Sequence, residues 1–228
     1  IFNNIQITCD YLIISDGVFS KGKSLLSNNE SNPIFNDTIA LRGIISKENL
    51  GKMNAENISL FLGSDFHYVI YPLNNDKKFN FSGILKHKLT SNEQKNYKLF
   101  EDNFFIENIK NKLSQKISPI IFEGLEDIKL FPVFVSKNFY IPPKNIFLVG
   151  DAFFAFSPSF AQGASQSIEG SNKLYESIVT NNNNLYNIRL KRLKMISNRS
   201  NFNQFVFHLS NPVMTGLRNI FLKIVTKN

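Results

Sequence analysis

The chain has 228 residues, of which 43% are hydrophobic and 13% aromatic, and it carries a formal net charge of +8. This composition supports one large domain or two small ones with a packed core, and it excludes an intrinsically disordered protein. The single cysteine, Cys9, excludes an internal disulfide and favours a reducing, cytoplasmic location.

The first 20 residues contain two short apolar runs, at 5–8 and 11–14, that we interpret as strands. Asp16 and Gly17 follow the second run, and on their own they indicate only a turn. No signal peptide is visible, and no apolar run approaches the roughly 18 residues of a membrane helix.

A β-rich segment follows from about residue 33 to residue 90. Its apolar runs predict four strands, at 38–46, 58–62, 66–73 and 79–86. His67 and Tyr71 lie on the third strand and project from one face, because strand side chains alternate. They could hydrogen-bond to a substrate or simply pack on a half-buried strand. Arg42, on the first strand, could face a substrate or brace the sheet.

Helical spacing of apolar residues over 93–117 predicts one or two helices, and residues 128–135 predict another strand. A strand at 146–149 then ends at a Gly-Asp pair, and a helix from about 162 to 180 begins after a proline-containing turn. A carboxylate at a strand end can accept hydrogen bonds from sugar or ribityl hydroxyls. A helix N-terminus offers free N–H groups to an electron-rich ligand.

Residues 185–228 predict helices interrupted at Asn211-Pro212. Lysines and arginines concentrate between 189 and 199, but no nucleic-acid motif accompanies them, so we interpret them as a solvated helix face. Residues 217–225 are apolar, and we expect a packed terminal helix rather than membrane contact. Three scattered histidines and one cysteine do not give metal-ligand spacing, so no metal site is expected.

The sequence resembles the FAD-dependent aromatic hydroxylases of the salicylate and para-hydroxybenzoate hydroxylase type. Their second FAD fingerprint, Gly-Asp-Ala-Ala-His, then Pro, then Gly-Gln-Gly-Ala-Asn-Gln, is similar to Gly150-Asp151-Ala152, Pro158 and Gln162-Gly163-Ala164-Ser165-Gln166. Their Gly-Ala-Asp-Gly-Val-x-Ser segment is similar to residues 14–20, and their His-x-x-x-Tyr-Pro segment to residues 67–72. The pattern Tyr186-x-x-Arg189-x-x-Arg192 resembles the salicylate-type tail.

The resemblance implies a role for each of these residues. Asp151 would accept hydrogen bonds from the ribityl chain of FAD, and Pro158 would fix the backbone beside the isoalloxazine ring. Residues 162–165 (Gln162, Gly163, Ala164 and Ser165) would supply backbone N–H groups to the flavin N1–C2=O edge, where negative charge accumulates. Asp16 and Gly17 would lie near the FAD pyrophosphate and be linked to NAD(P)H use. His67, Tyr71 and Arg42 would face the substrate, with His67 and Tyr71 as catalytic candidates.

Two positions depart from the family pattern. Phe153-Phe154 stands in place of the family's Ala-His, which puts any role of that histidine in doubt. Phe160-Ala161 stands where the family has Gly before Gln, which could reshape the loop without removing its N–H donors.

The expected fold is therefore α/β, or α+β for the fragment: part of a Rossmann-like FAD-binding domain with an inserted β-sheet substrate domain and C-terminal helices. We assign residues 1–30 and 141–182 to the FAD-binding part, 31–140 to the substrate domain and 183–228 to the C-terminal helices. None of the 11 glycines forms Gly-x-Gly-x-x-Gly, and the chain opens in strand material, so we expect a C-terminal fragment whose ADP-binding element lies upstream.

The resemblance implies an NAD(P)H-dependent monooxygenase that uses O2 to hydroxylate an aromatic or similar ring through a flavin C4a-hydroperoxide. The fragment alone is expected to bind FAD poorly and to be inactive. Two alternatives stay open: a non-hydroxylating FAD oxidoreductase of the same fold, and a basic binding module with relic flavin motifs, for which nucleic acid is one candidate ligand. The sequence favours a small-molecule substrate and no nucleic-acid partner. It does not indicate the substrate, the choice of NADH or NADPH, or the oligomeric state.

Overall fold

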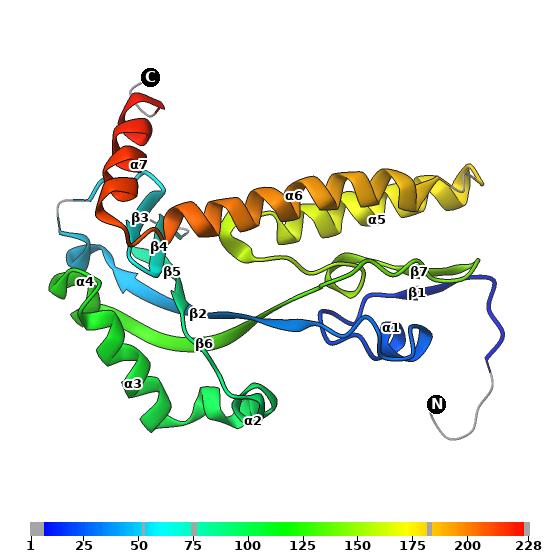
Figure 1. Cartoon of the computed structure of the whole chain (residues 1–228), viewed down its shortest axis with the longest axis horizontal. Helices are drawn as coiled ribbons and strands as arrows, with labels where there is room; N and C mark the ends of the chain where they lie inside the picture. The colour runs from blue at the N-terminus through cyan, green and yellow to red at the C-terminus, as the bar shows by residue number, and fades with distance from the viewer. Residues whose placement is uncertain (1–6, 52, 74–76, 182–183, 226–228) are drawn as a thin grey trace. The chain divides into compact units, whose positions relative to one another are not determined.

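The computed structural model describes residues 7–51, 53–73, 77–181 and 184–225. Its helices and strands form two compact units, each assembled from segments that are distant in sequence. The first unit contains residues 1–36 and 134–201, and the second contains residues 37–133 and 202–228. The mixed α and β fold expected from the sequence is confirmed (Figure 1).

Two parallel strands form the centre of the first unit. Strand β1 (Leu12–Ile14) pairs with β7 (Ile146–Leu148), in the register Ile14 to Leu148. Three helices belong wholly or mostly to this unit: α1 (Lys21–Leu26), α5 (Gly163–Val179) and α6 (Leu185–Phe207). Of the strand expected at 5–8, residues 5 and 6 lie outside the described residues, and residues 7 and 8 belong to no strand.

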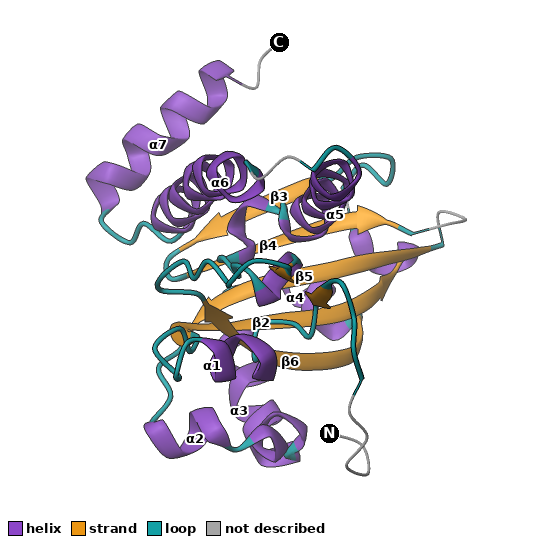
Figure 2. Ribbon diagram, turned by 90° about the vertical axis from the view of Figure 1, so that its right-hand side faces the viewer, coloured by secondary structure: helices purple, strands orange, loops and turns teal. Residues whose placement is uncertain are grey.

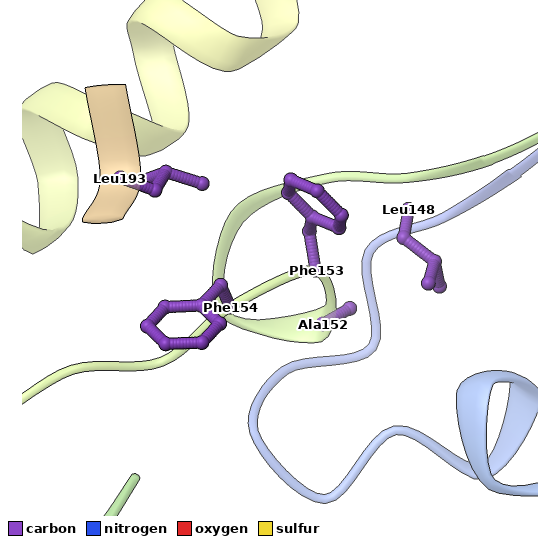
Figure 3. Packing of buried hydrophobic residues seen from close by; sticks show 5 residues of the cluster. All are labelled: Leu148, Ala152, Phe153, Phe154 and Leu193. Carbon is purple, nitrogen blue, oxygen red and sulfur yellow. The ribbon is translucent and has the colours of Figure 1, made fainter. Parts of the chain in front are cut away.

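The apolar core of the first unit surrounds the turn that follows β7. Its buried side chains are Leu148, Ala152, Phe153, Phe154 and Leu193 (Figure 3). Phe139 stacks on Phe154, with ring centroids 4.0 Å apart and an interplanar angle of 17°. The phenylalanines that replace the family's Ala-His are therefore core residues. Burying aromatic rings here stabilises the turn.

The second unit contains a five-stranded sheet in the order β3-β4-β5-β2-β6 (Figure 2). The strands are β2 (Ile34–Ser46), β3 (Ser59–Gly63), β4 (Phe66–Pro72), β5 (Lys78–Lys86) and β6 (Leu125–Val135). Each of the strands expected in this region is confirmed, with small shifts at the ends. Strand β2 is longer at its start than the apolar run alone predicts.

The strands form because aromatic and β-branched residues alternate with polar ones, which suits a pleated surface with one buried face. Phe79 and Phe81 on β5, and Phe66 and Tyr68 on β4, are buried on one face of the sheet. The opposite face carries Asn80 and Ser82 at the intervening positions of β5. The sheet therefore has an apolar face and a mixed face.

The described part of the second unit also contains four helices, and side chains cap the first turns of the first two. Helices α2 (Ser91–Lys95), α3 (Asn103–Ser114) and α4 (Pro119–Glu123) follow one another along the chain, separated by a 3₁₀ turn and a short loop, and α7 (Pro212–Val225) follows α6 after a short loop. Thr90 and Glu93 form a capping box at α2, and Asp102 caps α3. The expectation that residues 217–225 pack is wrong for Leu217, Ile220, Phe221 and Ile224, which are exposed.

Candidate functional site

The two aspartates singled out in the sequence follow two neighbouring strands. Asp16 lies two residues after the end of β1, and Asp151 lies three residues after the end of β7. Because β1 and β7 are parallel and in register, their carboxyl ends meet at one edge. The structure thus places both aspartates beyond the same edge of the two-stranded sheet, although most of the chain separates them in sequence.

Asp151 has no hydrogen-bond or ion-pair partner among the described residues, although neighbouring groups partly desolvate it. This desolvation raises the pKa of the Asp151 carboxyl above its ordinary value. The preceding residue, Gly150, has φ of +62°, a conformation that side chains disfavour. A glycine is therefore required to turn the chain so that Asp151 follows the strand directly.

Asp16 has a different environment. Its Oδ2 accepts a hydrogen bond from the Gly22 amide at 3.3 Å. Partial desolvation acts to raise the pKa of Asp16, but hydrogen bonds from the Ser20 side chain and nearby amides outweigh it and lower the pKa. Gly17 adopts φ of +83°, and Ser20 caps helix α1 through the Lys23 amide. Asp16 is thus held ionised at the start of a short helix.

The start of α5 lies beyond a turn at Pro158–Phe160. Gln162 is the N-cap residue, and no side chain caps the helix. A Cβ added to Gly163 would have no heavy atom within 4 Å, so this helix end is open. Gly163, Ala164 and Ser165 are exposed, and the first N–H groups of a helix have no acceptor within it. The arrangement leaves backbone donors for a ligand.

Ala161, directly before Gln162, has φ of +51° and ψ of 32°, the left-handed conformation. This is the region where the family pattern has glycine. The departure seen in the sequence therefore has a physical meaning: the loop keeps a conformation that favours glycine, and alanine adopts it with some strain.

Two contacts hold the loop between β7 and α5. The buried Lys23 donates through Nζ to the carbonyl oxygen of Phe153 at 3.1 Å, and desolvation lowers the pKa of Lys23. Ser136 accepts a hydrogen bond from the Ala155 amide through Oγ at 3.0 Å. Sequence reasoning missed Lys23. The available sequence signal was Ser20 as a candidate helix cap three residues before Lys23. A six-residue helix shows no periodicity that would place Lys23 on its buried side.

In the second unit, three predicted substrate residues share the mixed face of the sheet. Strand pairing sets Arg42 opposite Ser82, Tyr71 opposite Asn80, and His67 opposite Ile84. Residues directly opposite each other in an antiparallel sheet lie on the same face. Arg42 is exposed and has no hydrogen-bond or ion-pair partner among the described residues, and Tyr71 is half-buried.

His67 differs from its two neighbours on this face, because it is buried at 4% exposure. Its Nδ1 lies 2.8 Å from Nε2 of His208, and its ring contacts Phe207 edge-on with centroids 5.1 Å apart. Desolvation and then the charge of His208 lower the pKa of His67 to about 3. His67 therefore has a protein partner, and its predicted catalytic role stays a prediction.

Asn80 is a site candidate that sequence reasoning missed. Its Nδ2 is buried and has no hydrogen-bond partner among the described residues. A buried amide without a partner is costly, which makes such groups candidates for ligand contact. The alternation Phe79-Asn80-Phe81-Ser82 was the available sequence signal, because it puts Asn80 on the face of the strand away from the two phenylalanines.

Within the described ranges, no group of three or more histidine, cysteine or carboxylate side chains could hold a metal ion. Among the same residues, no helix has both the length and the apolar character needed to cross a membrane.

No protein-family model matches the sequence, and a search of curated proteins gives no match. Solved structures do match in fold. Klebsiella pneumoniae HpxO complexed with FAD and uric acid aligns with a TM-score of 0.73 at 16% identity, over 91% of this chain and 54% of HpxO. A salicylate hydroxylase substrate complex aligns with a TM-score of 0.69 at 15% identity, over 94% of this chain and 60% of that one.

The 2,6-dihydroxypyridine-3-hydroxylase from Arthrobacter nicotinovorans aligns with a TM-score of 0.60 at 14% identity, over 83% of this chain and 53% of the hydroxylase. The chain thus spans a little over half the length of the structures it matches. At this identity the similarity establishes the fold, which is that of these hydroxylases. The resemblance expected from the sequence is confirmed at this level.

Proposed function

We propose that the chain provides the second FAD fingerprint and the substrate-facing sheet of a flavin-dependent monooxygenase. The observation that carries the proposal is the placement of Asp16 and Asp151 at one edge of the paired strands β1 and β7. Two carboxylates at the carboxyl ends of adjacent parallel strands are typical of a ligand crevice. The fold shared with HpxO, which is complexed with FAD, supports flavin as that ligand.

The residues at this edge fit FAD in their chemistry. Asp151 is a carboxylate with no hydrogen-bond or ion-pair partner in the described part of the chain, so it can accept hydrogen bonds from ribityl hydroxyls. Open amides at Gly163 and Ala164 can donate to the flavin ring edge. In this proposal the amides of Gln162 and Ser165 belong to the same set of donors, Pro158 fixes the backbone beside the flavin ring, and Asp16-Gly17 lies toward the pyrophosphate.

Bound FAD supplies hydride acceptance and oxygen activation, and this chain's residues supply position and electrostatics. The helix N-terminus at Gly163 stabilises negative charge on the flavin edge, since its N–H groups and dipole point outward. NAD(P)H as the reductant and O2 as the oxidant are part of the proposal.

For the substrate, the mixed face of the sheet favours a small ring with an anionic or acceptor group. Arg42 offers an exposed cation, and Asn80 offers a buried amide N–H that has no partner among the residues the structure describes. Tyr71, opposite Asn80 on the neighbouring strand, offers a hydroxyl. We assign Arg42, Tyr71 and Asn80 to substrate binding. We assign His67, whose ring is held by His208, to supporting that face.

The test uses the complete protein and two matched variants. Asp151→Asn removes the unpartnered charge at the proposed site. Asp10→Asn removes an exposed carboxylate in the same unit that makes no hydrogen bond or ion pair among the described residues. We expect Asp151→Asn to weaken FAD binding by roughly 10- to 100-fold, because a hydrogen bond to a charged group contributes about 1.5–3 kcal/mol. Asp10→Asn should bind like the wild type.

FAD binding is measured by quenching of flavin fluorescence, and turnover by oxygen consumption with NADH or NADPH. A wild-type protein that stays colourless after incubation with FAD would refute the proposal. Equal FAD affinity in folded Asp151→Asn would remove Asp151 from the site. FAD binding without oxygen consumption would favour the non-hydroxylating flavoprotein alternative.

A further inference from the structure

One side of helix α6 makes successive contacts with the proposed flavin-binding segment. Its buried residues within the first unit are Leu185, Arg189, Leu193, Ile196 and Ser200. These positions recur every three or four residues, the spacing of one helix face, and the half-buried Tyr186 lies directly beside Leu185 at the start of the helix. The opposite side of the helix carries exposed cations. Leu193 points toward Phe153 and Phe154 of the turn (Figure 3).

Tyr186 contacts residues that precede and follow the Gly150-Asp151 pair in the chain. Its hydroxyl accepts a hydrogen bond from the Leu148 amide at 3.1 Å, and its ring packs against Phe153 with centroids 5.1 Å apart. The Val149 amide donates to Ile14 of β1, so the Leu148 amide points to the other edge of β7. Tyr186 thus satisfies an edge donor that would otherwise need another strand or water.

Arg189 contacts the first turns of α5. Its Nη2 donates to the backbone oxygen of Gln166 at 3.0 Å and to Oε1 of the same side chain at 3.1 Å. Its Nη1 donates to Oε1 of Glu169 at 2.7 Å. Gln166 in turn donates to Glu169 at 2.9 Å, so the three side chains form a closed network. Arg189 is buried, so these hydrogen bonds and the ion pair with Glu169 compensate for the loss of hydration of its charge.

A third contact lies about three turns beyond Arg189 along α6. Ser200 donates through Oγ to the backbone oxygen of Ser157, directly before Pro158. All three contacts therefore reach the segment that runs from β7 through the loop to α5. Tyr186 and Arg189 also line one small cavity of about 20 Å³ together with Asp151 and Gly163. That volume is room for one water molecule, so the packing between helix and turn is close.

We infer that Tyr186 and Arg189 are positioning residues that set the distance between the Asp151 carboxylate and the amides at Gly163. The inference rests on the proposed function. A flavin must be contacted at both points at once, and neither point is fixed by the short two-stranded sheet alone. Tyr186 and Arg189 lie one turn apart on α6. Tyr186 binds the end of β7 and Arg189 binds the start of α5, so both are held to the same helix. Preorganisation of this kind lowers the ordering cost of binding.

The experiment compares two conservative variants with two matched controls in the complete protein. Tyr186→Phe removes only the hydroxyl, and Arg189→Lys keeps the charge but loses the planar fork. The controls are Tyr175→Phe and Arg199→Lys. Both control residues are exposed, and neither makes a hydrogen bond or ion pair among the described residues. FAD affinity is measured by fluorescence quenching, and local order by amide hydrogen exchange without FAD.

We expect FAD affinity to fall by about tenfold in each test variant, the change given by one ordinary hydrogen bond, and to stay at the wild-type value in the controls. Exchange should speed up most at residues 148–153 in Tyr186→Phe and at 163–170 in Arg189→Lys. It should speed up less at residues 79–86 of the second unit, where exchange that requires global unfolding reports only the loss of overall stability. The visible absorption band of the bound flavin should also shift in the test variants, which a purely structural role would not cause.

The inference is overturned if both test variants bind FAD as tightly as the wild type, or if exchange speeds up equally along the whole chain. If Arg189→Lys fails to fold, Tyr186→Phe decides alone. A wild-type protein that binds no FAD would be a failure of the proposed function and would end this inference with it. Wild-type binding that the test variants retain would be a failure of the inference alone.

Discussion

Ala161 shows how a single backbone conformation explains a departure from a family pattern. It sits in the left-handed region, with φ of +51°, one residue before the N-cap of α5. A non-glycine residue there is strained because its Cβ crowds the following carbonyl, at a cost of roughly 1–2 kcal/mol. The turn keeps this conformation, so the strain is local and should be removable.

We therefore predict that Ala161→Gly increases the free energy of unfolding by about 1 kcal/mol. Alanine-to-glycine changes usually destabilise, so the sign is diagnostic. The matched control is Ala164→Gly in the first turn of α5, which should destabilise by about 0.5–1 kcal/mol because glycine weakens helices. Urea unfolding of both variants checks the prediction, and a destabilised Ala161→Gly would contradict it.

Residue-level reasoning from the sequence found the departure at 160–161 but not its conformation. A positive φ has no signature when the residue is alanine, since the pattern that reveals it is a glycine. Asp151 was identifiable because a carboxylate after an apolar strand and before a proline turn is a local pattern. That Asp151 has no partner within the described ranges could not be predicted from the sequence, because the residues near it are set by tertiary packing.

At the scale of elements, His67 on strand β4 contacts His208, the residue after α6, and this contact makes the stability of the fold depend on pH. His67 and His208 face each other at 2.8 Å, and the pair is stable when one ring nitrogen donates to the other. Desolvation and the charge of His208 lower the pKa of His67 to about 3. Desolvation, opposed by Asp65 and reinforced by Lys86 and Lys116, lowers the pKa of His208 to about 4.

We predict that acid weakens this contact well above the pH at which carboxylates titrate. A histidine with a lowered folded pKa contributes fully above its unfolded value of about 6.5, and the contribution falls as pH drops toward the folded pKa. At about pH 5.5 each neutral histidine costs on the order of 1 kcal/mol of stability. Carboxylates with lowered pKa, such as Glu169, lose their contribution only near and below their ordinary range.

The measurement is urea unfolding at about pH 7.5 and pH 5.5, for the wild type and His208→Gln. Glutamine can still hydrogen-bond to His67 but does not titrate, so the variant should lose less stability between the two pH values than the wild type. His87→Gln is the comparison, because His87 has a lowered pKa but lies outside the pair. Equal pH dependence in the wild type and His208→Gln would refute the role of the pair.

The helices and strands predicted best from the sequence are those whose pattern lies within their own residues. The β-strands of the sheet, the strand at 146–148 and helix α5 each have their own alternation, periodicity or turn residues. Helix α1 has six residues and is too short to show a helical periodicity of apolar residues. The partner of His67 lies 141 residues later in the sequence, so no local pattern could predict a buried histidine pair.

At the scale of the whole molecule, the two units are joined by elements rather than by linkers. The unit boundaries fall at 36–37, 133–134 and 201–202, inside β2, β6 and α6 respectively. In a strand or helix that crosses a unit boundary, one continuous run of backbone hydrogen bonds includes residues of both units. Partial unfolding of one unit would therefore disrupt elements of the other, which favours a single cooperative transition.

This connectivity makes a prediction about FAD, whose proposed protein contacts all lie in the first unit. FAD at a hundredfold excess over its dissociation constant should increase the unfolding free energy of the complete protein by about 2.7 kcal/mol. Because the units unfold together, amide exchange that requires global unfolding should slow in both, at residues 163–179 and equally at residues 79–86. Native-state hydrogen exchange with and without FAD measures this. Slowing confined to the first unit would mean that the elements crossing the boundary do not couple the two units.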